Sequence, residues 1–364
     1  MKVETYDAIV IGAGVVGLGI TYELSKQQGL KTLTIDQGYP MSGTSGATQA
    51  WIWVHSKTPY KYGQLSLASA NRYQELQEEI GDIEYIRSGG IAPIFSKQEL
   101  YDAKALQLEM SKANIPVDLL SREEILKLEP NLSPNLLGAT YSPIDGHVNP
   151  FKLIQRYHLQ AKINGAHFSF YNGVRALEKT EVGYKVTTNR GVYEAEKVIL
   201  SAGLWSKSIG EFLNIRIPTH TSRGQILVTE PTEPLIHHVI IGMRQLSNGI
   251  VLMGFSKEDV GYDRRTTMDV LQDTAEKSVN LVPKLKDVKI VRSFSGIRVM
   301  PNDGLPIFGE VSEQKNLYVA VTHSGMTLSA ILGKSMAELV TTGESSFPME
   351  AYSIERFKGR EENQ

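Results

Sequence analysis

The chain has 364 residues, and its 38 basic side chains nearly balance its 40 acidic ones, which leaves a net charge of −2. This balance provides no strongly basic field, so we expect no binding of nucleic acid. Because the chain contains no cysteine, disulfides, thiolate nucleophiles, iron–sulfur clusters and cysteine-linked cofactors are excluded, and we expect no metal site. No apolar stretch approaches the ~18 residues of a membrane span, so we expect a cytoplasmic protein without one.

The N-terminal part of the chain predicts a strand, a helix and a second strand. Residues 6–11 (YDAIVI) form a short apolar run of the kind found in buried parallel strands, residues 15–28 have helical spacing, and residues 31–36 (KTLTID) predict the second strand. A loop rich in small and hydroxylated residues follows at 42–56 (SGTSGATQAWIWVHS), and residues 60–80 predict a long helix.

Helices and strands continue to alternate toward the C-terminus, with strand-rich segments between. The pattern predicts four short strands forming a meander within 167–200, further helices, and further strands. The further helices are expected at 97–113, 121–129, 264–286 and 325–341. The further strands are expected at 225–230, 249–254, 288–299 and 317–321. The order favours an α/β nucleotide-binding domain interleaved with a mainly antiparallel domain. The last residues, RFKGREENQ, are expected to form a solvated tail.

A dinucleotide-binding fingerprint joins the first strand to the first helix. Gly12 permits a tight turn, Gly14 lets the backbone approach a pyrophosphate, and Gly17 permits close packing of helix on strand. Asp36, about 20 residues further on at the end of the second predicted strand, would accept hydrogen bonds from a ribose. The helix N-terminus offers free N–H groups to the phosphates. This fingerprint by itself does not distinguish NAD from FAD.

Three later segments accompany the fingerprint and the 42–56 loop. They are VILSAGLWS (198–206), SGIRVMPNDGLPIFG (295–309) and LYVAVTHSGMTLSAILG (317–333). The ordered set resembles the flavin-dependent amine oxidase family that includes glycine oxidase, D-amino acid oxidases and dehydrogenases, and sarcosine oxidase. The loop and the THSGMTL turn are similar to a branch containing opine oxidase subunits and the cyanide-forming glycine dehydrogenase subunit.

The resemblance implies a Rossmann-like FAD-binding domain interleaved with an antiparallel-sheet substrate domain. Residues 1–85, 141–225 and 298–364 would form the first domain, and residues 86–140 and 226–297 the second. FAD would be bound non-covalently. The residues matching the family's cofactor positions are Gly12, Gly14, Val15, Val16, Gly17, Asp36, Gln37, Ser45, Thr48, Gln49, Ala50, Val174, Ala202, Gly203, Trp205, Arg298, Ser324, Gly325, Met326 and Thr327.

Arg298 and His323 are the candidate catalytic residues. Arg298 matches the family's carboxylate-binding arginine, although Val299 and Met300 here precede the proline that usually follows it directly. A bidentate guanidinium would fix the direction of the substrate Cα–H bond; the alternative is a surface ion pair with Asp303. His323 could bind substrate, tune the flavin or cap the last helix.

Two further residues are predicted on the substrate side of the site. Trp51 would form a wall of the substrate cavity, or pack behind it. Arg244 would bind a second carboxylate of the substrate, such as that of an opine. The alternative is that Arg244 is an ordinary surface arginine.

The predicted function is oxidation of the C–N bond of an amino acid or related amine by hydride transfer from Cα to flavin, followed by imine hydrolysis. The alternatives are a non-catalytic flavin-binding subunit of a larger dehydrogenase and an NAD-dependent dehydrogenase. The expected partners are a small amino acid or secondary amine and, from the resemblance, either a second copy of this chain or other subunits of a dehydrogenase complex.

Overall fold

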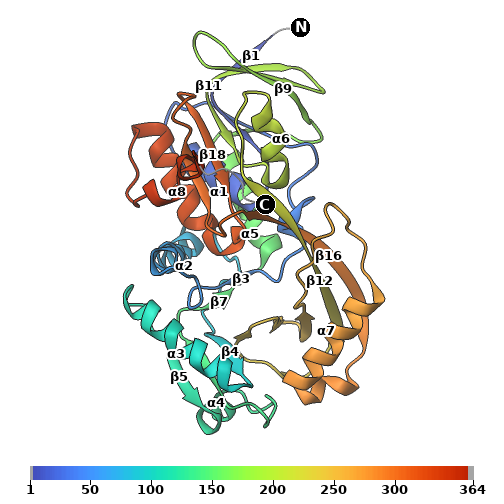
Figure 1. Cartoon of the computed structure of the whole chain (residues 1–364). Coiled ribbons are helices and arrows are strands. Elements are labelled where there is room, and N and C mark those ends of the chain that lie inside the picture. The colour runs from blue at the N-terminus through green and yellow to red at the C-terminus, as the bar shows by residue number, and fades with distance from the viewer. Residues whose placement is uncertain (1–2, 360–364) are drawn as a thin grey trace.

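The computed structural model describes residues 3–359 and has two sheets of eight strands each, one in the upper and one in the lower part of Figure 1. The upper sheet has a parallel centre, in which β1 lies between β11 and β2, with β18 and β8 beyond them. Its strands are β1 (Glu4–Ile11), β2 (Thr32–Ile35), β8 (His167–Ser169), β9 (Val174–Lys179), β10 (Tyr184–Thr188), β11 (Val192–Leu200), β17 (Ile307–Glu310) and β18 (Leu317–Val321).

Helices cover one face of this sheet, and an antiparallel extension covers the other. Helix α1 packs against α5 and α8, and α2 packs against α8; these helices are α1 (Val15–Ser25), α2 (Tyr60–Ile80), α5 (Pro150–Ile163) and α8 (Gly325–Thr342). On the opposite face, β9, β10 and the short α6 (Ser206–Glu211) close a second apolar cluster. Burial on both faces explains why β18 and the second half of β1, from Ala8 to Ile11, are apolar.

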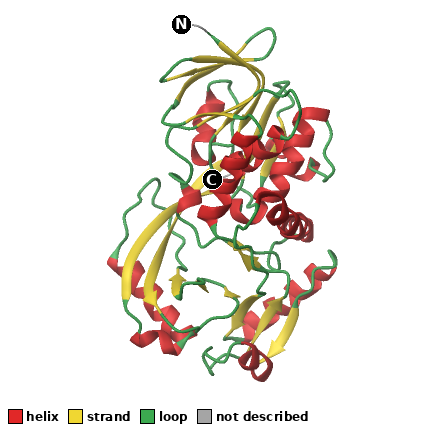
Figure 2. Ribbon diagram, turned by 180° about the vertical axis from the view of Figure 1, so that it is seen from behind, coloured by secondary structure: helices red, strands yellow, loops and turns green. Residues whose placement is uncertain are grey.

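The lower sheet is mainly antiparallel, and three helices accompany it (Figure 2). Its strands, in spatial order, are β16 (Ile290–Pro301), β12 (Thr219–Pro231), β15 (Ile250–Met253), β14 (Met243–Gln245), β13 (Val239–Ile240), β4 (Gly90–Ile94), β6 (Gly138–Ser142) and β5 (Asp118–Ser121). The helices are α3 (Lys97–Ser111), α4 (Arg122–Leu128) and α7 (Met268–Leu281). A separate ribbon pairs β3 (Trp51–Ile52) with β7 (Gly146–His147).

Strands β12 and β16 connect the two regions. They pair over most of their length, from Thr219 opposite Pro301 to Thr229 opposite Ile290, and run from the upper to the lower part of the molecule (Figure 1). The domain boundaries predicted at 225/226 and 297/298 fall inside these strands. The two strands therefore bring residues of the lower sheet beside the parallel sheet.

Most predicted elements are present, but one strand was misplaced and several elements were not predicted, among them the short strands β13 and β14. The meander is formed by β9, β10 and β11, whereas β8 pairs in parallel with β2. The prediction that β8 belongs to the meander is wrong, because this three-residue strand pairs with β2 at the edge of the parallel core instead. Helix α5 was not predicted; its Asn149 N-cap accepts hydrogen bonds from the N–H groups of Phe151 and Lys152.

The tail prediction for RFKGREENQ is wrong for its first residues. The guanidinium of Arg356 donates to both carboxylate oxygens of Asp303 and to the carbonyl of Leu305, so this segment is anchored on the fold. The rest of the predicted tail, residues 360–364, lies outside the described residues.

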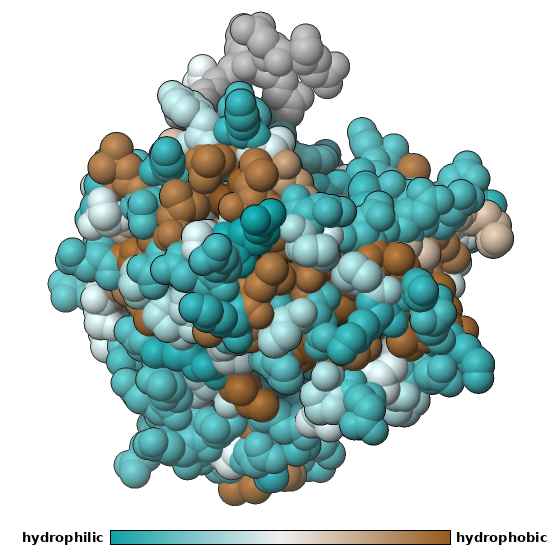
Figure 3. All heavy atoms as spheres, turned by 90° about the horizontal axis from the view of Figure 1, so that it is seen from below, coloured by the Kyte–Doolittle hydropathy of each residue, from teal (hydrophilic) through white to brown (hydrophobic). Residues whose placement is uncertain are grey.

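The surface carries scattered apolar side chains. Tyr101 and Leu108 on α3 are 70% and 68% exposed, and the face seen from below shows separate apolar patches among polar side chains (Figure 3). Between residues 3 and 359, no helix is long and apolar enough to cross a membrane. Within the same range, no group of His, Asp and Glu side chains could hold a metal ion.

Candidate active site

A cavity of about 860 Å³ lies between the parallel sheet, the 42–56 loop and strands β12 and β16. All but one of the predicted cofactor residues line it, and so do the predicted substrate residues Trp51, Arg298 and His323. Gly17 and Arg244 are outside the lining. Elements far apart in the sequence therefore bring the two predicted sets of residues to one continuous space.

The turn before α1 forms a backbone cradle at one end of the cavity. Gly12 has φ +114°, and a Cβ at this position would lie 2.5 Å from the Ser201 carbonyl. Gly17 sits directly against the Gly12 carbonyl, so its role is packing, as the fingerprint predicts. The N-cap of α1 is Gly14, with no side-chain cap, so N–H groups of the first turn face the cavity. This arrangement fits a pyrophosphate.

Asp36 is fixed at the end of β2 beside this cradle. Its carboxylate accepts hydrogen bonds from the backbone N–H groups of Ala13 and Gly38, both at 2.7 Å. Gln37 and Val174 line the cavity next to it. A carboxylate has about four acceptor positions, so two backbone bonds leave capacity for ribose hydroxyls.

The 42–56 loop is tied to both regions. Ser45 Oγ accepts a hydrogen bond from the N–H of Val15, and Thr44 Oγ1 donates to the Ile297 carbonyl on β16. Gln49 Nε2 donates to the carbonyls of Gly242 and Gly254, both at 3.1 Å. Within the loop, Thr48 Oγ1 accepts from the N–H of Ala50. The loop therefore runs from the cradle of α1 to the lower sheet.

Two tryptophans lie in the second half of the loop and differ in exposure. Trp53 is 5% exposed and its ring packs at a tilt against His55, whose imidazole is fully buried and hydrogen-bonded to Asp145. Trp51 is only partly buried, and its buried indole Nε1 has no hydrogen-bond partner among the described residues. Thr327 of α8 accepts from the N–H of Trp53 and donates to the Trp51 carbonyl, which fixes this wall.

The segment after β11 opens toward the same cavity. Gly203 has φ +56°, and a Cβ there would meet nothing within 4 Å, so this turn faces open space. Ala202 and Trp205 line the cavity beside it. Small residues at this point leave room for a close approach of a ligand to the backbone.

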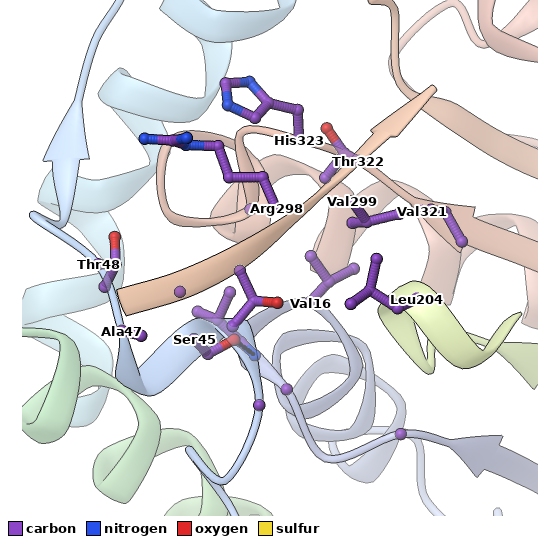
Figure 4. Close-up of a pocket in the computed structure, with 18 of the residues that line it drawn as sticks. Val16, Ser45, Ala47, Thr48, Leu204, Arg298, Val299, Val321, Thr322 and His323 are labelled. Atoms are coloured by element: carbon purple, nitrogen blue, oxygen red, sulfur yellow. Dashed lines mark hydrogen bonds between the residues drawn. The ribbon is translucent and has the colours of Figure 1, made fainter. Parts of the chain in front are cut away.

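Arg298 projects into the cavity from β16, on the same side as His323 (Figure 4). Its guanidinium covers Gly224 on the paired strand β12, where a Cβ would overlap it. Nη1 donates to the Ser256 carbonyl at 3.1 Å, and burial lowers the Arg298 pKa. The alternative ion pair with Asp303 is absent, because that carboxylate is bound by Arg356.

His323 is a neutral imidazole. Burial, followed by the positive charges of Lys57, Arg298 and Lys257, lowers its pKa to about 3. Lys57 Nζ donates to Ser324 Oγ at 2.6 Å, and Ser324 Oγ lies 3.3 Å from His323 Nδ1. Lys57, Ser324 and His323 therefore form one hydrogen-bonded chain at the start of α8.

Helix α8 begins at the cavity immediately after His323. Its first residues Gly325, Met326 and Thr327 line the space, and its N-cap Ser324 makes no side-chain capping bond. The free N–H groups and the partial positive charge of this helix end favour negative charge in the cavity.

The structure does not bring Arg244 to the cavity. This side chain is 3% exposed, and its Nη1 donates to the Val148 carbonyl. Two cations near His323, Lys57 and Lys257, were missed because single lysines in loops carry no motif; only the fold brings them to this end of the cavity.

Comparison with known proteins shows the class of protein. The model of the family described as DAO, FAD dependent oxidoreductase, matches residues 7–339, so the chain belongs to this family and uses FAD. The backbone cradle, the Asp36 carboxylate and the N-terminus of α8 fit this cofactor. The alternative of an NAD-dependent dehydrogenase is thereby overturned.

Individual relatives span nearly the whole chain. A subunit of opine oxidase from Agrobacterium tumefaciens is 28% identical over 98% of both chains. Glycine oxidase of Geobacillus kaustophilus is 27% identical, again over 98% of both. A crystal structure of glycine oxidase from that organism covers 96% of this chain and 98% of its own, with a TM-score of 0.91. The predicted family and fold class are therefore confirmed.

Proposed function

We propose that this protein oxidises the Cα–N bond of an amino acid or a secondary amine that carries a carboxylate. The observation that carries the proposal is Arg298. Its guanidinium faces the cavity and, among the described residues, is hydrogen-bonded only to a backbone carbonyl. The negative charge of Glu258 acts on Arg298 through space, but that carboxylate is bound by Arg223. A partly buried cation without an ion-pair partner is costly unless an anionic ligand meets it, and a substrate carboxylate would provide two parallel hydrogen bonds.

Bound FAD supplies the acceptor for the hydride that leaves Cα. The residues of the chain orient the substrate and set its protonation state. Arg298 would fix the carboxylate, and Trp51 would form a wall of the substrate cavity. The neutral imidazole of His323 would offer the substrate a hydrogen bond without adding charge.

The charges of the cavity also favour the reactive form of the amine. Lys57, Lys257 and Arg298 line the same cavity, and the positive charge of each lowers the pKa of His323. Positive charges nearby lower the pKa of an amine, so bound substrate would lose its ammonium proton and expose the nitrogen lone pair. Release of a hydride from Cα requires that lone pair, and the resulting imine would be hydrolysed in water.

Anaerobic mixing with candidate substrates tests the proposal. The purified holoenzyme should show a flavin absorbance band near roughly 450 nm, and that band should bleach with an amino acid or N-substituted glycine. Each acid is paired with its amide, which keeps the amine and removes the anion. Bleaching by the amide as fast as by the acid would contradict the role of Arg298.

The same experiment separates a catalytic role from that of a non-catalytic subunit. The Agrobacterium relative is itself named as a subunit of opine oxidase, and we propose that this chain also works with other subunits. If an amine bleaches the flavin of the chain alone, the chain carries the catalytic centre. A partner subunit would then serve electron transfer to an acceptor, or assembly. If no amine bleaches it with or without other subunits, the proposed function is wrong.

A further inference from the structure

The substrate end of the cavity holds more positive charge than one carboxylate can neutralise. Lys57, Lys257 and Arg298 line the cavity and all act on His323. The lining contains one acidic residue, Asp36, and that carboxylate is bonded to Ala13 and Gly38 at the opposite end. Lys57 and Arg298 are partly buried, where like charges are costly unless an anion binds between them, whereas Lys257 is exposed.

The three cations differ in what they already bind. Lys57 is committed to Ser324 Oγ at 2.6 Å, beside the start of α8. Arg298 is held by the Ser256 carbonyl, which leaves its remaining donors for one carboxylate. The ammonium of Lys257 has no hydrogen-bond or ion-pair partner among residues 3–359, although this residue is exposed enough to meet solvent.

The acidic neighbour of Lys257 is also occupied. Glu258 accepts a hydrogen bond from Arg223 Nη2 at 2.6 Å and others from Gln225 Nε2 at 3.0 and 3.2 Å. It therefore does not neutralise Lys257. This lysine follows β15 and lies one residue after Ser256, whose carbonyl holds Arg298, so its ammonium and the Arg298 guanidinium belong to one pocket.

We propose that the substrate is a dicarboxylic amine, with Arg298 binding the carboxylate next to the reacting carbon and Lys257 binding the distal one. The inference rests on the proposed function and deepens it by naming the substrate class. A dicarboxylate brings one more negative charge than a simple amino acid, and this charge meets the cation that lacks a partner. The sequence predicted that Arg244 would bind the distal carboxylate, but this residue lies outside the cavity lining.

Binding of two inert ethers tests the inference without turnover. Diglycolate and methoxyacetate have an ether oxygen in place of the amine nitrogen and differ by one carboxylate. Isothermal titration of the holoenzyme should give an affinity for diglycolate roughly tenfold or more above that for methoxyacetate, as expected for a partly desolvated charge pair. Equal affinities would overturn the inference.

Variants assign the distal site to a residue. Lys257→Met should bring the two affinities within about twofold by weakening diglycolate alone, and Lys257→Arg should restore most of the difference. Lys97→Met, which changes an exposed lysine outside the cavity, should have no effect. An unchanged ratio in Lys257→Met, or a ratio lost in Lys57→Met instead, would overturn the assignment to Lys257.

A substrate pair separates failure of this inference from failure of the proposed function. Iminodiacetate and sarcosine differ in the same way as the two ethers but contain an oxidisable C–N bond. Faster flavin bleaching by iminodiacetate supports both proposals. Bleaching by sarcosine at an equal or greater rate supports the proposed function and contradicts the dicarboxylate, whereas bleaching by no amine at all contradicts the proposed function.

Discussion

The Asp36 end of the cavity presents backbone groups and small side chains, whereas the His323 end presents long cations and an indole. At the first end, Gly12 and Gly14 leave N–H groups accessible and Asp36 is fixed by two backbone bonds. At the second end, Arg298 extends from β16 of the lower sheet, and Lys257 belongs to the segment after β15. One end depends on backbone geometry and the other on side-chain charge. Substitutions at the first end should therefore weaken FAD binding, and substitutions at the second should weaken substrate binding.

The largest effect is expected at the backbone end. Gly12→Ala places a methyl group 2.5 Å from the Ser201 carbonyl. It also puts a side chain on a residue with a positive φ, a backbone conformation that favours glycine. Overpacking of this kind costs about 3 kcal/mol, which corresponds to about 100-fold weaker FAD binding, and without FAD there is no turnover. The ratio of flavin to protein absorbance after purification measures it.

Gly165→Ala is the matched control for the backbone strain. Gly165 has φ +98°, and a Cβ there would meet nothing within 4 Å. It shares the left-handed strain of Gly12 but not the overlap, so FAD content should stay normal. Full retention of FAD by Gly12→Ala would show that the cradle tolerates a side chain.

The next effect is expected at the charged end. Arg298→Ala removes the charge-assisted hydrogen bonds to the substrate carboxylate, each worth about 1.5–3 kcal/mol, so the KM should rise roughly 100-fold while FAD stays bound. Stopped-flow reduction at increasing substrate concentration measures this. Arg292→Ala changes an exposed arginine on the same strand and should leave the KM unchanged. An unaltered KM in Arg298→Ala would remove Arg298 from the site.

A smaller effect is expected where the two ends meet. Gln49→Ala removes the donor that bonds the carbonyls of Gly242 and Gly254. Loss of these bonds should lower the free energy of unfolding by about 1–2 kcal/mol and slow flavin reduction, because the loop between the two ends loosens. Thermal unfolding measures the first quantity. Gln98→Ala, on exposed α3, is the control and should change neither.

The smallest effect concerns the neutral imidazole. The pKa of His323 in the folded protein is about 3, below its ordinary value of 6.5, so the unfolded chain takes up the proton first as the pH falls. Stability from the neutral imidazole is therefore present above pH 6.5 and is lost toward pH 3. Between roughly pH 6.5 and 5.5, wild type should lose about 1 kcal/mol more than His323→Asn. Urea unfolding at both pH values measures it, and equal losses would contradict a neutral His323.

Local sequence patterns predicted the elements of the backbone end well. The α2 and β18 boundaries, 60–80 and 317–321, agree with the structure, because helical spacing and continuous apolar runs are local properties. The fingerprint was equally readable, since its glycines are required by one short turn. Helix α5 was missed although Asn149 caps it. Strand β8 was misplaced because the sequence of a short strand does not indicate which strand it pairs with.

The sequence by itself indicated the cofactor end, the family and the candidate Arg298, because each rests on short motifs, and within one motif the residues are close together in the chain. Only the tertiary structure decided which charges surround His323. Pairing of β12 with β16 carries Arg298 to the parallel sheet, the segment after β15 adds Lys257, and the segment after β3 adds Lys57. It also leaves Arg244 outside the cavity lining. Electrostatic interaction depends on distance in space, and no local pattern encodes which distant lysines meet.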